Sequence, residues 1–262
     1  MIKVCLITGG TSGIGLSTAK AMAESGYVVY EISRRKEGND YVCHFQGDIT
    51  DEKTLEPIVD EIIRKEGHID VLINNAGYGI SGAVEFTRTE DAVRQFDVNF
   101  FGMVRMNKII IPLMRKQGYG RIVNISSVAG TIPIPFQTYY SATKSAINSY
   151  TMALSNEVRP FGISVCCIQP GDIRTGFTDA RKKSEAGDDV YKGKISKSVS
   201  GMERDEQSGM NPDAAGRFIC KVAIRKNVKP VYTIGLMYQT ACLLVRILPR
   251  RVMNFIVRLM YA

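Results

Sequence analysis

The 262-residue sequence predicts an α/β protein that forms one domain, 1–262, around a single doubly wound parallel sheet with helices on both faces. Three observations support this prediction. Short apolar runs alternate with longer amphipathic stretches, the runs are apolar at consecutive positions, and a glycine-rich turn follows the first run. Continuous apolar strands are expected where helices cover both faces of a parallel sheet.

The apolar runs and the amphipathic stretches define the expected elements. We expect strands at 4–7, 28–32, 42–45, 71–74, 120–126, 164–169 and 230–233. We expect helices near 13–25, 54–66, 90–114, 139–158 and 212–222. Asn211 and Pro212 favour the start of the last helix, as an N-cap residue followed by proline at the first helical position.

Two segments depart from this alternation. The segment 176–210, here called the lid segment, is rich in Lys, Glu, Asp, Ser and Gly with few periodic apolar positions, so we expect a mobile lid. The segment 235–262, here called the tail, is basic and apolar and is expected to be helical on both sides of Pro249. On its second helix, one apolar face is expected to contain Val252, Phe255, Ile256 and Leu259.

The net charge of +8 lies at the C-terminal end. Residues 1–212 hold 25 basic and 25 acidic residues, whereas residues 213–262 hold nine basic residues and one acidic residue, Asp213. No basic motif interleaved with aromatic residues occurs, so we expect no nucleic-acid partner. For the tail, two alternatives stay open: it covers the domain's own core or substrate mouth, or it makes a peripheral contact with a membrane surface.

The cysteines and histidines indicate a location and exclude a class of site. The six cysteines fall on or beside apolar runs without a CxxC pair, and the N-terminal residues lack the features of a signal peptide. We therefore expect reduced, buried cysteines in a cytoplasmic protein. Because His44 and His68 are the only histidines and no Cys/His cluster occurs, we expect no metal site.

The turn after the first strand predicts a dinucleotide site in a Rossmann-type sheet. It reads Thr-Gly-Gly-Thr-Ser-Gly-Ile-Gly over residues 8–15, with glycines spaced G-x-x-x-G-x-G. Small residues let the backbone approach a pyrophosphate, and the helix N-terminus offers free N–H groups and a positive dipole. The spacing differs from the longer G-x-G-x-x-G fingerprint.

The end of the second strand predicts NADP(H) rather than NAD(H). An acidic residue is expected there in proteins that bind the adenosine ribose hydroxyls of NAD. In this chain Ser33 takes that position and Arg34 and Arg35 follow. An aspartate would repel a 2′-phosphate, whereas arginine binds one through two parallel hydrogen bonds.

Tyr140 and Lys144 are four residues apart and share one face of an expected helix. Such a pair occurs often by chance, so the prediction depends on its surroundings. Ser127 follows the fifth strand, at the sheet edge where ligands bind in open α/β sheets. The fourth strand ends in Asn-Asn-Ala-Gly over residues 74–77, and Asn99 is a further candidate.

In order and spacing, these motifs resemble the short-chain dehydrogenase/reductase family. The resemblance is close over about residues 1–175 and loose beyond them. It implies an NADP-dependent enzyme that interconverts a ketone and a secondary alcohol. The family pattern places its serine thirteen positions before the tyrosine, as Ser127 is here, which disfavours Ser126. Tyr139 is followed four residues later by Thr143 instead of lysine and is the lesser candidate.

The resemblance implies catalytic roles. Tyr140 would give a proton to the carbonyl oxygen, or take one from the alcohol in reverse. Lys144 would stabilise the phenolate and hold the nicotinamide ribose. Ser127 would hydrogen-bond the substrate oxygen, and Asn99 would help to hold a water behind Lys144. The cofactor-binding set is then Gly9, Thr11, Ser12, Gly13, Ile14, Gly15, Ser33, Arg34, Arg35, Asp48, Ile49, Asn75, Ala76, Gly77, Tyr140, Lys144, Pro170, Gly171, Ile173 and Thr175.

An apolar loop predicts a hydrophobic substrate. Residues 128–136, after Ser127, are almost wholly apolar, so Phe136 and the lid segment are expected to line the pocket beside Tyr140. The tail is also similar to those of family members that act on steroids, sphingoid bases and other lipid-like ketones. We therefore expect a hydroxysteroid or lipid-like substrate, and a homo-oligomer.

Two other functions stay open. One is a reductase of carrier-bound 3-oxoacyl groups, for which the basic tail would be a docking patch. The other is a catalytically idle NADP(H)-binding regulator, which a missing catalytic residue would favour; all four are present here.

Overall fold

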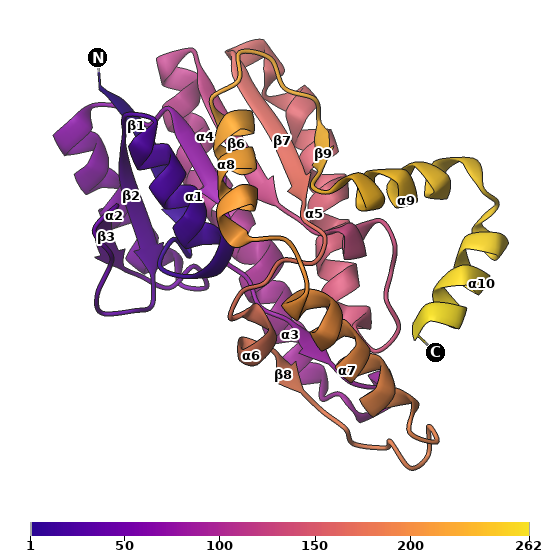
Figure 1. Cartoon of the computed structure of the whole chain (residues 1–262). Helices are drawn as coiled ribbons and strands as arrows, with labels where there is room; N and C mark the ends of the chain where they lie inside the picture. The colour runs from indigo at the N-terminus through magenta and orange to yellow at the C-terminus, as the bar shows by residue number, and fades with distance from the viewer. Residues whose placement is uncertain (1, 262) are drawn as a thin grey trace.

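The computed structural model describes residues 2–261 and contains one sheet of seven parallel strands (Figure 1). The sheet order is β3-β2-β1-β4-β6-β7-β9. The strands are β1 (Lys3–Thr8), β2 (Tyr27–Ser33), β3 (Cys43–Gln46), β4 (Val71–Asn74), β6 (Gly120–Ile125), β7 (Ile163–Gln169) and β9 (Val231–Thr233). All seven expected strands are confirmed.

The order of the strands reverses between β1 and β4, which pair in register from Cys5 with Val71 to Thr8 with Asn74. From β1 the chain continues outward to β2 and β3, and from β4 it continues to the opposite edge. In a doubly wound sheet, ligands bind in the crevice outside the carboxyl ends of the strands at this reversal. The predicted fold class is confirmed, and it places the glycine-rich turn after β1 at this crevice.

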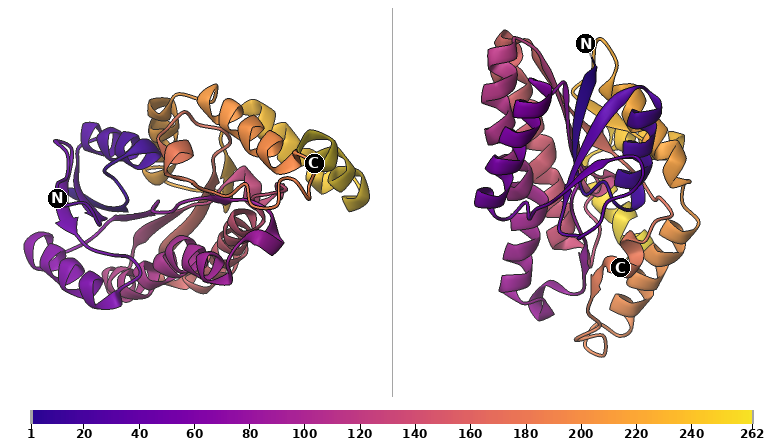
Figure 2. Two further views of the ribbon diagram at one scale, coloured as in Figure 1. Left: turned by 90° about the horizontal axis from the view of Figure 1, so that it is seen from below. Right: turned by 90° about the vertical axis from the view of Figure 1, so that its left-hand side faces the viewer.

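Helices cover both faces of the sheet (Figure 2). The side chains of α1 and α8 bury one face with Met22 and Ile219, and α2, α4 and α5 bury the other with Ile62, Ile110 and Leu154. The long helices are α1 (Gly13–Glu24), α2 (Glu52–Glu66), α3 (Thr89–Phe96), α4 (Gly102–Gln117), α5 (Thr138–Glu157), α7 (Lys194–Gln207), α8 (Pro212–Ala223), α9 (Leu236–Ile247) and α10 (Arg250–Tyr261).

Local sequence signals explain where these helices start and stop. The Asp51 side chain accepts a hydrogen bond from the backbone N–H of Lys53 at the start of α2, and Gly67 ends that helix with φ +80°. As expected, the Asn211 side chain caps α8 at the backbone N–H of Asp213, with Pro212 at the first helical position.

The single helix expected over 90–114 is interrupted. α3 ends at Phe96, a turn of π-helix covers Asp97–Phe101, and α4 then begins at Gly102. Single turns of π-helix inside α-helices are frequent at functional sites, and this one contains Asn99.

The lid segment contains regular structure that its composition did not predict. It forms α6 (Phe177–Ala180), a short strand β8 (Lys182–Lys183) paired with β5 (Ile80–Ser81), and the fourteen-residue helix α7. The composition did not reveal α7, whose few apolar side chains, Ile195, Val199 and Met202, share one buried face; the mobility of the lid segment stays a prediction. The cysteines also differ in one respect, since Cys43 is exposed while the other five are buried.

The tail forms the two expected helices. α9 leads away from β9 and α10 turns back toward α7 (Figure 1). The apolar face expected on α10 is not buried against the domain: Val252, Phe255, Ile256 and Leu259 are all exposed, and the buried residue of α10 is Val257. Within residues 2–261, neither these helices nor any others have the length and apolar character needed to cross a bilayer.

Candidate active site

The glycine-rich turn forms a tight pocket at the end of β1. Gly9 and Gly13 adopt φ values of +68° and +54°, which favour glycine. A Cβ atom on Gly15 would lie 2.0 Å from the carbonyl oxygen of Gly9, so only glycine lets α1 approach this turn. Ser12 precedes α1 without capping it by its side chain, and the first turn holds no acidic residue. The N-terminus of α1 therefore keeps its positive dipole available to an anion.

Glu31 holds this turn in place through its buried carboxylate, and the sequence analysis did not identify it. Its buried carboxylate accepts hydrogen bonds from the backbone N–H of Gly10 (2.9 Å) and pairs with Nδ1 of His44 (2.6 Å). A charged residue within the apolar run 28–32 was the available signal, because a buried charge requires partners.

The residues predicted to select the cofactor lie at the edge of the same cleft. Ser33 ends β2, and Arg34 and Arg35 follow it with exposed side chains. A guanidinium nitrogen of Arg35 donates to the carbonyl oxygen of Thr11 in the glycine-rich turn (3.3 Å). The Arg35 guanidinium thus lies beside the turn, Arg34 lines the same cleft, and no carboxylate occupies the position of Ser33.

The end of β4 is tied to β1 by side-chain hydrogen bonds. The Thr8 hydroxyl accepts from the backbone N–H groups of Asn75 (3.1 Å) and Ala76 (3.2 Å), and the Asn75 amide donates to the carbonyl oxygens of Thr8 and Gly9. Asp48 lies across the cleft with its carboxylate bonded to Thr50. These bonds fix the floor of the cleft.

Ser127, Tyr140 and Lys144 meet at the carboxyl end of β6. Lys144 is buried on α5, where its ammonium donates to the carbonyl oxygen of Ile125 (2.9 Å) and lies 5.6 Å from the centroid of the Tyr140 ring. The Ser127 hydroxyl accepts from the backbone N–H of Ala129 and lies close enough to the phenol of Tyr140 to lower its pKa. The phenol, the hydroxyl and the ammonium therefore form one cluster.

Burial shifts the pKa values of this cluster in opposite directions. It raises the pKa of Tyr140 to about 12, and the nearby Ser127 hydroxyl opposes that shift. Burial also lowers the pKa of Lys144 to about 8. At neutral pH the phenol of Tyr140 is therefore protonated and able to donate a proton.

Asn99 lies behind the cluster, outside the cleft lining. Its buried amide accepts from the backbone N–H of Tyr78 (2.9 Å) and donates to the carbonyl oxygen of Tyr78 (2.9 Å) and to the hydroxyl of Thr143 (3.2 Å). Asn99 thus joins α5 to the chain that follows β4, on the side of Lys144.

One continuous cleft of about 920 Å³ brings the predicted residues together. Every predicted cofactor-binding residue lines it, as do Ser127, Tyr140 and Lys144. The substrate side is mostly apolar, with walls that include Val128, Ala129, Ile132, Ile134, Phe177, Met202, Leu244, Ile256 and Val257.

Phe136 was wrongly predicted to line this cleft. The loop after Ser127 contributes Ile132 and Ile134 to the wall, but the chain turns at Phe136, which has φ +59°. Its ring packs instead against Tyr191 at a centroid distance of 5.7 Å, beside the buried Ile195 and Val199. The aromatic ring beside Tyr140 belongs to Phe177, at a centroid distance of 5.7 Å.

Comparison with known proteins places this arrangement in a family. The family model described as short chain dehydrogenase matches residues 3–186. The chain belongs to the short-chain dehydrogenase family. A 3-ketodihydrosphingosine reductase of Bacteroides thetaiotaomicron is 40% identical to it over 99% of this chain and 98% of the relative. A probable short-chain type dehydrogenase/reductase of Helicobacter pylori, VdlC, is 35% identical over 94% of this chain and 93% of the relative.

Solved structures agree with this assignment. A short-chain dehydrogenase from Streptomyces avermitilis resembles this chain with a TM-score of 0.81 at 30% identity, covering 92% of this chain and 90% of the other. The protein is therefore a short-chain dehydrogenase, an oxidoreductase whose fold binds a nicotinamide cofactor.

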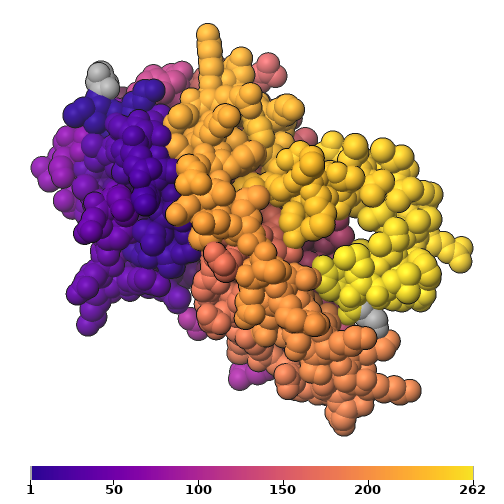
Figure 3. Space-filling view, in the orientation of Figure 1, coloured from indigo at the N-terminus to yellow at the C-terminus, as the bar shows by residue number. Residues whose placement is uncertain are grey.

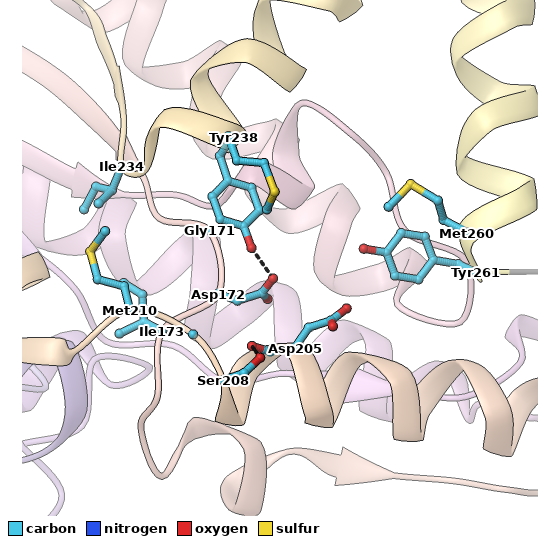
Figure 4. Close-up of a pocket in the computed structure, with 12 residues that line it drawn as sticks. Gly171, Asp172, Ile173, Asp205, Ser208, Met210, Ile234, Tyr238, Met260 and Tyr261 are labelled. Atoms are coloured by element: carbon cyan, nitrogen blue, oxygen red, sulfur yellow. Dashed lines mark hydrogen bonds between the residues drawn. The ribbon is translucent and has the colours of Figure 1, made fainter.

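A second pocket of this short-chain dehydrogenase, of about 480 Å³, adjoins the cleft below the tail (Figure 4). The Tyr238 hydroxyl on α9 donates to the Asp172 carboxylate, and the Tyr238 ring covers Gly171, where a Cβ atom would lie 2.2 Å from it. Burial raises the pKa of Asp172. Tyr238, which the sequence interpretation did not single out, thus fixes α9 over the loop that follows β7.

Proposed function

We propose that this short-chain dehydrogenase interconverts a lipid-like ketone and its secondary alcohol with NADP(H), using Tyr140 as the proton donor and acceptor. The observation that carries the proposal is the cluster of Ser127, Tyr140 and Lys144 at the junction between the glycine-rich end and the apolar end of one cleft. A phenol that is protonated at neutral pH suits the reduction of a carbonyl group.

In the proposed mechanism, the bound nicotinamide supplies the hydride in reduction and accepts it in oxidation. Ser127 hydrogen-bonds the substrate oxygen, and Tyr140 gives its proton to that oxygen as negative charge develops there. The Lys144 ammonium stabilises the resulting phenolate, because an opposite charge nearby favours the ionised form. Asn99 holds α5 in place through Thr143 and, on this proposal, holds a water that returns a proton toward Lys144.

The cleft fits a dinucleotide with a 2′-phosphate. The open turn at Gly9, Gly13 and Gly15 leaves room for a pyrophosphate next to the uncapped N-terminus of α1. Arg34 and Arg35 supply the donors that a 2′-phosphate requires, and Ser33 leaves it free of repulsion. These features support NADP(H) rather than NAD(H).

The walls around Tyr140 support a hydrophobic substrate. Ile132, Ile134, Phe177 and Met202 lie on the substrate side of the cleft, and residues of the tail continue the apolar surface outward. The relative from Bacteroides thetaiotaomicron is named as a 3-ketodihydrosphingosine reductase, which acts on a long-chain ketone. We therefore propose long-chain ketones first, with hydroxysteroids as the second lipid class.

A substrate panel tests this function. Purified protein is mixed with NADPH and, in separate reactions, with 3-ketodihydrosphingosine, ketosteroids and short 3-oxoacyl thioesters, and the absorbance of NADPH is followed. We expect turnover of a lipid ketone. Turnover of the thioesters alone would replace this proposal with the carrier-linked reductase, and binding of NADPH without any turnover would replace it with a regulator.

We also propose a cytoplasmic homo-oligomer. The support is a group of exposed apolar side chains on neighbouring helices, Val93 on α3, Phe101 in the π-turn and Met152 on α5. Light scattering of the purified protein measures the oligomeric state, and a monomer at micromolar concentration would contradict the proposal.

A further inference from the structure

The two tail helices present an apolar outer surface. Figure 3 shows the tail projecting from the molecule, with a hollow between it and the domain. The outward side chains are between 42% and 80% exposed and do not line the cleft. We call this set the tail surface; it consists of Leu236, Leu243 and Ile247 on α9, and Val252, Phe255 and Leu259 on α10.

The inner sides of the same helices are already occupied. Tyr238 is bonded to Asp172, and Cys242 and Val257 are buried. Because the domain already packs against these inner sides, the tail surface faces outward. Monomeric proteins seldom expose so many large apolar side chains together unless they serve as a contact surface.

The charge around the tail surface is positive. Arg246, Arg250, Arg251 and Arg258 are exposed, and residues 214–262 contain no Asp or Glu. Within the part of the chain that the structure describes, none of these four arginines forms an ion pair. Apolar side chains flanked by unpaired arginines are the pattern of a helix that lies in an anionic lipid interface.

The tail surface continues into the active-site cleft. Four apolar side chains of the tail are exposed to solvent and also line the cleft that leads to Tyr140. They are Met237, Leu244, Ile256 and Met260. An apolar path therefore joins the outer surface of the tail to the reacting group.

We propose that the tail surface docks on an anionic phospholipid bilayer, and that the substrate enters from the bilayer past Leu244, Ile256 and Met260. The substrate half of this inference rests on the proposed function, whereas the docking half does not. The charge favours a bilayer over a second copy of the chain. Pairing two tails would bring eight arginines together without an acidic residue in either tail.

Co-sedimentation of the full chain with vesicles tests the docking. The vesicles contain phosphatidylcholine alone or with about one-third phosphatidylglycerol. We expect binding to the anionic vesicles that is at least about tenfold tighter and is weakened by salt. Phe255→Ser with Leu259→Ser should reduce that binding about tenfold or more, and Arg251→Gln with Arg258→Gln should remove most of the preference for anionic lipid.

The matched control is Val190→Ser with Ile224→Ser, which removes two exposed apolar side chains outside the tail and should bind vesicles like the wild type. Because Phe255 and Leu259 do not line the cleft, their double variant should keep wild-type turnover of a soluble short ketone while losing turnover of a vesicle-embedded ketone. That split separates docking from damage to the fold.

Several results would overturn the docking. They are absence of wild-type binding to anionic vesicles, equal binding by the Phe255/Leu259 double variant, and a loss of self-association in that variant without any vesicle binding, which would make the tail surface a contact between copies. Vesicle binding requires no turnover. Intact binding without turnover of any lipid ketone would support docking and overturn the proposed function.

Discussion

The ammonium of Lys144 lies 5.6 Å from the centroid of the Tyr140 ring, one helical turn along α5. Both side chains lie at the end of β6, since Lys144 donates to the Ile125 carbonyl and the Ser127 hydroxyl lies close enough to Tyr140 to lower its pKa. Burial keeps the phenol protonated and destabilises the ammonium. This opposition leads to three predictions about the acid–base chemistry.

Tyr140→Phe should lower kcat by at least about a hundredfold while leaving the Kd for NADPH nearly unchanged, because it removes only the proton-transferring hydroxyl. Steady-state kinetics and fluorescence titration with NADPH measure the two quantities. Tyr139→Phe is the matched control and should keep its activity, since Tyr139 does not line the cleft. Substantial activity in purified Tyr140→Phe would refute the acid–base role.

Lys144→Met should stabilise the protein without cofactor while abolishing turnover. The folded state lowers the pKa of Lys144 from 10.5 to about 8, so burying its charge costs on the order of 3 kcal/mol below pH 8. The variant also loses the hydrogen bond to Ile125, which reduces the expected gain in the free energy of unfolding by about 1 kcal/mol.

Thermal unfolding of both proteins at about pH 7 and about pH 10 checks this prediction. The penalty in the wild type disappears as pH rises from about 8 toward 10.5, because the folded state releases its proton first. The Tm advantage of Lys144→Met should therefore shrink at the higher pH. A variant that unfolds below the wild type at both pH values would contradict it.

The kcat/KM for ketone reduction should be constant below about pH 8 and should fall above it. Tyr140, with its pKa raised to about 12, stays protonated over this range, whereas Lys144 loses its charge near pH 8. The profile of kcat/KM against pH measures this. A wild-type profile that stays level to about pH 10 would show that Lys144 acts without its charge.

The sheet was predictable from sequence because its strands are mainly apolar, although polar residues such as Glu31, His44 and Asn124 interrupt some of them. The glycine-rich turn and the residues of the catalytic cluster were found for a similar reason, since short motifs fix their positions relative to strand ends. The lid segment was harder to predict. The three buried apolar residues of α7 are separated by Ser, Lys and Gly, and their periodicity becomes evident only when the buried face is known.

Side-chain direction was the other source of error. Phe136 belongs to an apolar loop beside the catalytic serine, but a backbone turn at φ +59° sends its ring under α7. On α10, apolar residues occupy most of the helix surface, so periodicity does not reveal which of them contact the domain. Only the tertiary structure shows that Val257 faces inward and Phe255 outward.

Ser33→Asp with Arg34→Ala should move cofactor preference from NADPH toward NADH. The aspartate would repel the 2′-phosphate and accept hydrogen bonds from ribose hydroxyls, and the loss of Arg34 removes one charge-assisted phosphate contact. Together the two changes should alter the discrimination by a few kcal/mol, or about two orders of magnitude in the ratio of kcat/KM values.

The ratio of kcat/KM for NADPH and NADH, measured with one ketone, checks this prediction. Arg217→Ala is the matched control, because Arg217 is an exposed arginine on α8 that does not line the cleft. Arg35 remains in the double variant and its guanidinium bonds the Thr11 carbonyl, so the preference for NADPH should weaken without a complete loss of cofactor binding. An unchanged ratio would place the selectivity outside the Ser33–Arg34 edge of the cleft.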